Sequence, residues 1–294
     1  MKTCAAVFAL AACALGQPLA GVIDIHAHCD PDAVPRSIDA IDLARLGKER
    51  GMRGMVLKSH YEPTATLAYV VRKAVPGIEI FGGIDLNLTV GGLNPAAVER
   101  MATIKGGWGR VIWMPTFDAE NQVRFSKENR PFVPVSKDGR LLPAAGQVIG
   151  VAVKHHLLLE TGHSSAQEGL LLIREARRQG LENIVVTHAM LPPVSMSIPQ
   201  MQEAAKMGAY IEFVYNALIG PNKNFEMQDY VKAIREVGPA SCILASDLGQ
   251  AANPLHPDGL AAFFTGLRQA GIPQTDIDRM AKVNPAKVLG LPAN

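Results

Sequence analysis

The sequence has little net charge and no long apolar run. Its 29 lysine and arginine residues nearly balance 27 aspartate and glutamate residues, and the formal net charge is +2. No basic cluster indicates a nucleic-acid partner, and no apolar segment reaches the roughly 20 residues that a membrane-spanning helix needs. Because 48% of the residues are hydrophobic, we expect one globular domain over 21–294. The oligomeric state stays open, and a homo-oligomer is compatible with the sequence.

Residues 1–20 differ in composition from the rest. Lys2 precedes the apolar segment Cys4–Gly16, which is typical of a cleaved export signal and too short to cross a bilayer. Cleavage is expected between Gly16 and Gly21, which predicts a periplasmic or secreted protein. A cytoplasmic protein with an N-terminal helix is the alternative, and Leu10-Ala-Ala-Cys13 also resembles a lipoprotein cleavage box.

Cysteine is scarce, since the chain has four and only two would remain after such a cleavage. Cys29 follows the first predicted strand, whereas Cys242 lies near the start of the last one. Neighbouring parallel strands would hold them at opposite ends, beyond the Cα separation of about 7 Å that a disulfide tolerates. We therefore expect no disulfide between them.

Short apolar runs rich in β-branched residues recur along the chain, each followed by a helical pattern. The first is Gly21–Ile25, which continues into His26-Ala-His28. The other seven are Met52–His60, Ile78–Leu86, Gly109–Pro115, His156–Gly162, Asn183–His188, Ala209–Asn216 and Ser241–Asp247.

The ends of these eight runs lie 26 to 32 residues apart, apart from one step of 47. A strand with a returning helix takes about 30 residues, so the spacing predicts an α/β fold, a (β/α)8 TIM-type barrel with an insertion after strand 4. An open doubly wound sheet is the alternative, but the glycine-rich dinucleotide turn is missing after the first strand. Within the insertion, Phe117–Arg140, a hairpin about Asp138-Gly139 is expected, either as a lid or as a surface excursion.

Histidines gather where the predicted strands end. In a strand, residues two apart share a face, so His26 and His28 project together, as do Lys58 and His60. Because barrel enzymes build their sites at the carboxyl ends of the strands, we expect these polar residues to converge there. The strand-end set also contains His163, His188, Asp247 and, less directly, His256, whereas His155 and His156 are expected to be structural.

At this point the chain resembles the amidohydrolase superfamily of metal-dependent hydrolases. The resemblance covers residues 20–291 and rests on His26-Ala-His28, His163, His188, Asp247 and a closing Asn284-Pro-Ala helix. Asp24-Ile-His-Ala-His and Thr161-Gly-His163 resemble a poorly characterised branch. The resemblance implies a divalent metal, with Zn²⁺ expected and Mn²⁺, Fe²⁺ or Co²⁺ as alternatives.

One departure from that pattern concerns the residue that bridges two metals. Binuclear members commonly carry a carbamylated lysine or a glutamate at the end of strand 4, but here that strand ends in Trp113-Met-Pro-Thr116. Lys58 is the expected substitute, with Glu160 as a second candidate. Carbamylated, Lys58 would hold two ions about 3.5–4 Å apart; as an amine it would bind a substrate carboxylate or oxyanion beside a single metal.

The implied chemistry is hydrolysis of an amide, cyclic imide, lactone or ester by a metal-activated water. Asp247 is both a metal ligand and the catalytic general base, while His60 and Arg36 are expected to contact the substrate. A loop salt bridge is the alternative role of Arg36. A decarboxylase that uses a single metal and a non-catalytic metal-binding barrel remain the alternative functions.

Overall fold

The computed structural model describes residues 19–292 as a barrel of parallel strands. The predicted export signal therefore lies outside the described residues, except for Leu19 and Ala20. The eight barrel strands are β1 (Ile23–His28), β2 (Gly54–Lys58), β3 (Glu79–Asp85), β4 (Gly109–Trp113), β7 (Leu158–Glu160), β8 (Ile184–Val186), β9 (Tyr210–Val214) and β10 (Cys242–Ala245).

The strands follow one another around the barrel in chain order. Each neighbouring pair in this order is parallel. Beyond β10 the ring closes, because the Asp247 backbone N–H donates to the His26 carbonyl at 2.8 Å and the His28 N–H donates to the Leu248 carbonyl at 2.9 Å. The predicted (β/α)8 barrel is confirmed.

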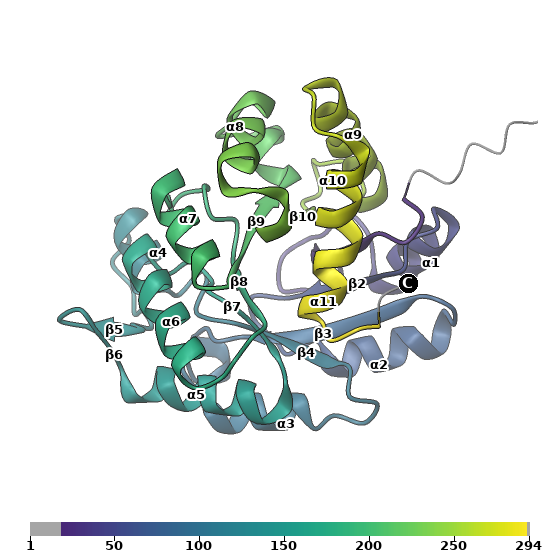
Figure 1. Cartoon of the computed structure of the whole chain (residues 1–294). Helices are drawn as coiled ribbons and strands as arrows, with labels where there is room; N and C mark the ends of the chain where they lie inside the picture. Colours follow the sequence, from purple (N-terminus) through teal and green to yellow (C-terminus); the bar gives the residue numbers. More distant parts are fainter. Residues whose placement is uncertain (1–18, 293–294) are drawn as a thin grey trace, which may run out of the picture.

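Helices surround the strands in Figure 1 and bury one face each against them. Their starts carry the expected signals: Asn94 caps the helix that begins at Pro95, and Ser165 and Glu168 form a capping box. The helices are α1 (Ala40–Glu49), α2 (Ala65–Ala74), α3 (Pro95–Ala102), α4 (Glu120–Phe125), α5 (Pro143–His155), α6 (Ala166–Arg178), α7 (Ile198–Lys206), α8 (Met227–Val237), α9 (His256–Gln269), α10 (Gln274–Asp278) and α11 (Asn284–Val288).

Every predicted apolar run contains a strand, but most of the strands are shorter than the runs. The run His156–Gly162 contains only Leu158–Glu160, because His156 ends α5 in a left-handed conformation (φ 53°). The residues just after the strands leave the ladder and turn into the loops that carry the polar side chains. The period of the hydrophobic pattern therefore predicts the strands, whereas their ends depend on local backbone geometry.

The insertion after β4 contains α4 and the predicted hairpin, formed by β5 (Ser136–Lys137) and β6 (Arg140–Leu141). The hairpin projects from the edge of the barrel in Figure 1. Phe117 and Gln122, from the first part of the insertion, line the cavity at the strand ends. That part of the insertion is a wall of the cavity.

The last helix fastens the end of the chain to the barrel. The Asn284 side chain donates to the carbonyls of Cys242 at 2.7 Å and Pro239 at 3.1 Å. Cys242 and Cys29 are both buried and free, as predicted.

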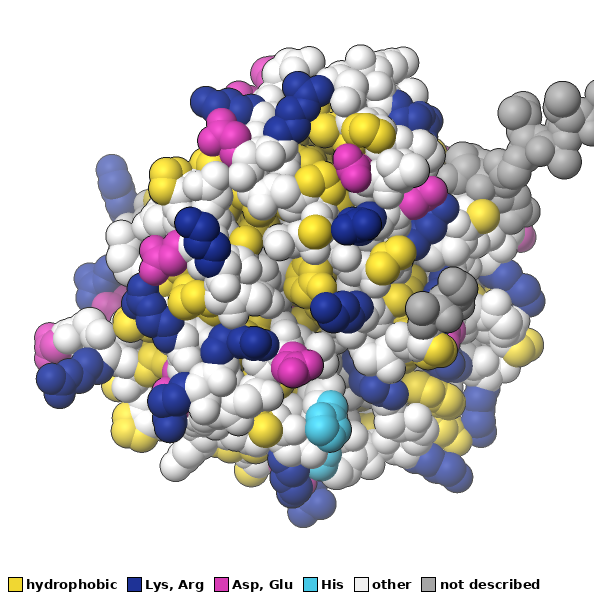
Figure 2. Space-filling view, viewed as in Figure 1, with side chains coloured by type: hydrophobic (Ala, Val, Ile, Leu, Met, Phe, Trp, Pro, Cys, Tyr) yellow, Lys and Arg dark blue, Asp and Glu magenta, His cyan; other side chains and the backbone are white. Residues whose placement is uncertain are grey.

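Within residues 19–292 no helix combines the length and the apolar composition needed to cross a bilayer. On the face shown in Figure 2, lysine and arginine side chains are separated by other residues and do not merge into one patch.

Candidate metal centre

A cavity of about 300 Å³ lies at the carboxyl ends of the strands. It brings together all eight site residues predicted from the sequence. Its lining residues are His26, His28, Arg36, Lys58, His60, Phe117, Gln122, His163, His188, Leu191, Pro192, Asn216, Asn222, Asp247 and Gln250.

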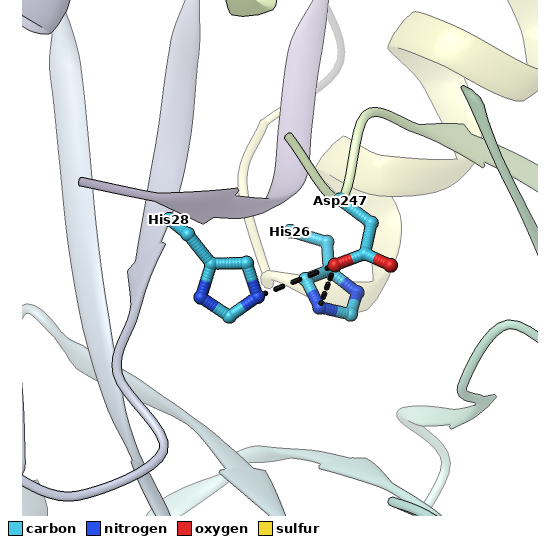
Figure 3. Close-up of side chains that lie close together, drawn as sticks. All are labelled: His26, His28 and Asp247. Atoms are coloured by element: carbon cyan, nitrogen blue, oxygen red, sulfur yellow. Dashed lines mark ion pairs between the residues drawn. The ribbon is translucent and has the colours of Figure 1, made fainter. Parts of the chain in front are cut away.

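Three side chains from β1 and the end of β10 meet at one point of this cavity (Figure 3). His26 Nε2 and His28 Nε2 each lie 3.2 Å from the same oxygen, Asp247 Oδ1. All three side chains are at most 10% exposed. Two imidazoles and a carboxylate at this spacing could hold a metal ion.

The hydrogen bonds behind the two imidazoles fix which nitrogen faces that point. His28 Nδ1 lies 3.1 Å from the Lys58 carbonyl oxygen, which can only accept a hydrogen bond. His26 Nδ1 lies 3.2 Å and 3.3 Å from the two carboxylate oxygens of Glu212. Burial lowers the pKa of both histidines to about 3, so the rings are neutral and Nδ1 carries the proton.

As a result, the two Nε2 lone pairs face an Asp247 oxygen with no hydrogen atom between them. His26 Nε2, His28 Nε2 and Asp247 Oδ1 are all acceptors. The Asn216 amide donates to Asp247 Oδ2 at 3.2 Å, which favours the charged form of the acid, so this group is a carboxylate. A divalent cation satisfies all three acceptors at once, so these residues fit a metal.

A second pair of histidines lies across the cavity. His163 Nε2 and His188 Nε2 are 3.2 Å apart, and His163 Nδ1 lies 2.8 Å from Gln122 Oε1. Within residues 19–292, His188 Nδ1 is buried without a hydrogen-bond partner. Because the rings of His26 and His188 stack with centroids 6.0 Å apart, this pair adjoins the first group.

His163 reaches the cavity because of the glycine before it. Gly162 has a left-handed φ of 61°, and a Cβ there would overlap the Met114 carbonyl oxygen. The turn places the His163 N–H on the Pro115 carbonyl at 2.9 Å. The Thr161-Gly-His163 motif therefore needs glycine at its centre for a steric reason.

Two ligands also have left-handed backbones. φ is 26° at His188 and 50° at Asp247, in a region that non-glycine residues seldom adopt. Strain of this kind is characteristic of sites where geometry is held by the surrounding structure.

Lys58 lies beside the first group of side chains. Its side chain is fully buried and its Nζ lies 3.1 Å from His26 Nε2 and 3.9 Å from Asp85 Oδ2. It also lies over the Trp113 ring, 5.1 Å from the centroid. The end of β2 therefore places Lys58 beside His26.

The two predicted substrate contacts also lie in the cavity. His60 stacks on Phe117, with ring centroids 3.8 Å apart, and its Nδ1 is held by Thr116 Oγ1 at 2.8 Å. Arg36 lines the cavity and also makes the loop salt bridge, to Asp32 Oδ2 at 2.6 Å.

His256 is the exception among the strand-end histidines. Its ring is buried at the start of α9, where Nε2 bonds the Leu248 carbonyl at 2.8 Å, and it does not line the cavity. Glu160 is also outside the lining, because its carboxylate accepts from Thr187 Oγ1 at 3.0 Å deeper in the barrel. Asp24 is a structural acid, which accepts hydrogen bonds from the backbone N–H groups of His26 and Ser246.

Sequence reasoning missed several partners of the ligands. Glu212 in β9 accepts from His26 and, at 2.7 Å, from the His188 backbone N–H. Asn216 Nδ2 donates to Asp247 Oδ2 at 3.2 Å. An acidic residue inside the apolar run Ala209–Asn216 was the available signal for Glu212, because such a residue needs a buried partner.

Replacing Glu212 tests its role as a positioning residue. In Glu212→Gln the carboxylate that orients His26 is lost, so we expect zinc affinity to fall by about 10- to 100-fold. Competition with a chromogenic chelator measures the affinity. Glu203→Gln, at an exposed ion pair with Arg174, is the matched control, and a folded Glu212→Gln protein with unchanged affinity would contradict the assignment.

Comparison with known proteins identifies the family. Residues 21–212 match the model of a family of unknown function, DUF6282. The chain belongs to this family. No curated protein matches the chain, so the rest of the comparison for this DUF6282 protein is structural.

Solved structures share the barrel at low sequence identity. A phosphotriesterase homology protein from Escherichia coli, complexed with phosphate in its active site, is 17% identical with a TM-score of 0.65, over 92% of this chain and 99% of that one. A zinc-bound amidohydrolase from Burkholderia multivorans is 13% identical with a TM-score of 0.61, over 93% and 100%. A resiniferatoxin-binding protein from Rhodobacter sphaeroides is 13% identical with a TM-score of 0.65, over 95% and 94%. The resemblance to the amidohydrolase superfamily is confirmed at the level of the fold.

Proposed function

We propose that this DUF6282 protein is a metal-dependent hydrolase that cleaves a C–N or C–O bond in a small amide, cyclic imide, lactone or ester. The observation that carries the proposal is the meeting of three unprotonated acceptors, His26 Nε2, His28 Nε2 and Asp247 Oδ1. Each imidazole is oriented from behind by a hydrogen bond on Nδ1, which is the arrangement that presents a ligand to a metal.

The donor set suits Zn²⁺, and imidazole nitrogen with carboxylate oxygen also suits Mn²⁺, Fe²⁺ or Co²⁺. When bound, such an ion lowers the pKa of water towards about 7 and polarises a carbonyl group. His26, His28 and Asp247 would hold the first ion, and His163 and His188 a second.

Asp247 has the position of a general base. Its Oδ1 faces the two histidines, while its Oδ2 is oriented by the Asn216 amide. In this role the carboxylate takes a proton from the attacking water and later delivers it to the leaving group. His60 lies in the same cavity, beside the ligands, where it contacts the substrate.

We further propose that Lys58 is carbamylated and bridges the two halves of the centre. An ammonium 3.1 Å from His26 Nε2 competes with a divalent cation for the same lone pair, and the two positive charges repel. A carbamate replaces that positive charge by a carboxylate-like ligand.

The metal content of the purified protein, with its intact mass under non-denaturing conditions, tests both proposals. We expect two zinc ions per chain, a carbamate mass increment that is lost on acidification and maps to Lys58, and hydrolysis that stops on chelation and returns with zinc. One ion and an unmodified Lys58 would remove the bridge and bring decarboxylation into the substrate screen. No bound metal after reconstitution would contradict the proposed function.

A further inference from the structure

One cation of the cavity lies apart from the histidine cluster. Arg36 comes from the loop after β1, and its side chain is 6% exposed. Its Nε donates to Asp32 Oδ2 at 2.7 Å, and its Nη2 lies 2.6 Å from the same oxygen. Asp32 is fully buried, and its other oxygen accepts from the Ala33 N–H at 2.6 Å.

This pairing leaves one edge of the guanidinium unused. A guanidinium presents five N–H groups, and a carboxylate can bind two of them side by side. Asp32 Oδ2 accepts a hydrogen bond from Nε, whereas its contact with Nη2 is an ion pair without a hydrogen bond. Within residues 19–292, Nη2 is a buried atom with no hydrogen-bond partner, so the edge formed by Nη1 and Nη2 remains.

The loop that carries Arg36 is anchored to the loop after β10. Arg36 forms an antiparallel bridge with Gln250, and the Ser37 N–H donates to the Gly249 carbonyl at 2.9 Å. A guanidinium fixed by a buried carboxylate and a paired backbone loses little conformational freedom when it binds a ligand.

Gln250 and Asn216, which also line the cavity, already have hydrogen-bond partners within the protein. Gln250 Nε2 donates to the Asp247 carbonyl at 2.9 Å, and its Oε1 accepts from Asn253 Nδ2 at 3.0 Å. Asn216 donates to Asp247 and accepts from Asn253. Arg36 lines the cavity, whereas Asp32 does not.

We infer that Arg36 is an anion subsite and that the substrate carries a carboxylate group. The inference rests on the proposed hydrolase function, which it extends by naming the substrate class. A bidentate carboxylate is the ligand that the free edge of a guanidinium fits best. Since a cavity of about 300 Å³ is at the small end for ligand sites, the substrate is a small amide or ester with a carboxylate close to the scissile bond.

Binding of glutarate tests the subsite without turnover. Calorimetry compares glutarate with its neutral analogue glutaramide, on zinc-free and on zinc-loaded protein. We expect wild type to bind glutarate in both forms and at least about tenfold more tightly than glutaramide, and Arg36→Gln to lose that preference. Asp32→Asn/Arg36→Gln should behave like Arg36→Gln while leaving no unpaired buried carboxylate, and Arg45→Gln, at an exposed ion pair, should behave like wild type.

Three results would overturn the inference: no glutarate binding by wild type at millimolar concentration, equal binding of glutaramide, or unchanged glutarate binding in both Arg36 variants.

Turnover separates this inference from the proposed function. The mono-4-nitrophenyl ester of glutaric acid is compared with its neutral methyl diester, and we expect a preference of at least about tenfold in kcat/KM for the acid, lost in Arg36→Gln. Zinc-dependent hydrolysis of both esters without that preference would support the hydrolase function and contradict the Arg36 subsite. Arg36-dependent glutarate binding without hydrolysis of any ester, amide or lactone supports the subsite and removes the hydrolase.

Discussion

Asp247→Asn is expected to lower kcat by roughly 10²- to 10⁴-fold, the usual contribution of a positioned general base, while zinc remains bound. An amide oxygen still ligates a metal, but an amide does not accept the proton of the attacking water. Steady-state kinetics and zinc content of the same preparation measure the two effects.

A paired variant separates proton transfer from misorientation of the side chain. In the wild type, Asn216 Nδ2 donates to Asp247 Oδ2 at 3.2 Å. In Asp247→Asn alone, an amide N–H₂ group takes the place of Oδ2, so two hydrogen-bond donors face each other. Asn216→Asp in the same protein restores an acceptor opposite that donor. We expect the double variant to bind zinc as wild type does and still to lack activity; recovery of turnover, or full activity in Asp247→Asn, would remove Asp247 from its role as base.

Lys58→Met is expected to reduce zinc from two ions per chain to one. Methionine fills a similar volume beside Trp113 but cannot form a carbamate. The loss of kcat/KM should exceed the roughly 10- to 100-fold effect of removing an outer-shell partner, because a bridging ligand is lost. Zinc analysis and native mass measure the stoichiometry.

An exposed lysine serves as the control for this substitution. Lys154→Met alters a side chain that is 64% exposed and pairs with Glu99, and it should leave zinc content and activity as they are. Two zinc ions and full activity in Lys58→Met would show that the bridge lies elsewhere.

The fold and the convergence of the ligands could be predicted from the sequence because both follow from chain periodicity. Strand runs at intervals near 30 residues dictate a parallel barrel, and parallel strands bring their carboxyl ends to one rim. The prediction that His26, His28 and Asp247 lie close together needed no information beyond the positions of the strand ends. Lys58 also ends a strand and therefore lies at this rim, whereas its role as a bridge rests on the family resemblance and stays a prediction.

What could not be predicted depends on register and on loop geometry. Glu212 lies inside a strand, and only the pairing of β8 with β9 shows that its carboxylate lies under His26 and His188. The Asn216 side chain reaches Asp247 because β9 and β10 are neighbouring strands whose carboxyl ends lie at the same level of the barrel. His256 was grouped with the strand-end histidines, but the start of α9 turns its ring to the Leu248 carbonyl, which no spacing reveals.

The left-handed backbones of His188 and Asp247 restrict how these positions can change during evolution. Outside glycine, histidine, aspartate and asparagine are the residue types most often found in that conformation. A replacement that keeps a carboxylate but seldom adopts a left-handed backbone, such as glutamate for Asp247, would shift the loop that carries it. A substitution at these two positions must therefore meet two requirements: the new side chain must be able to bind the metal, and the new residue must tolerate a left-handed main chain.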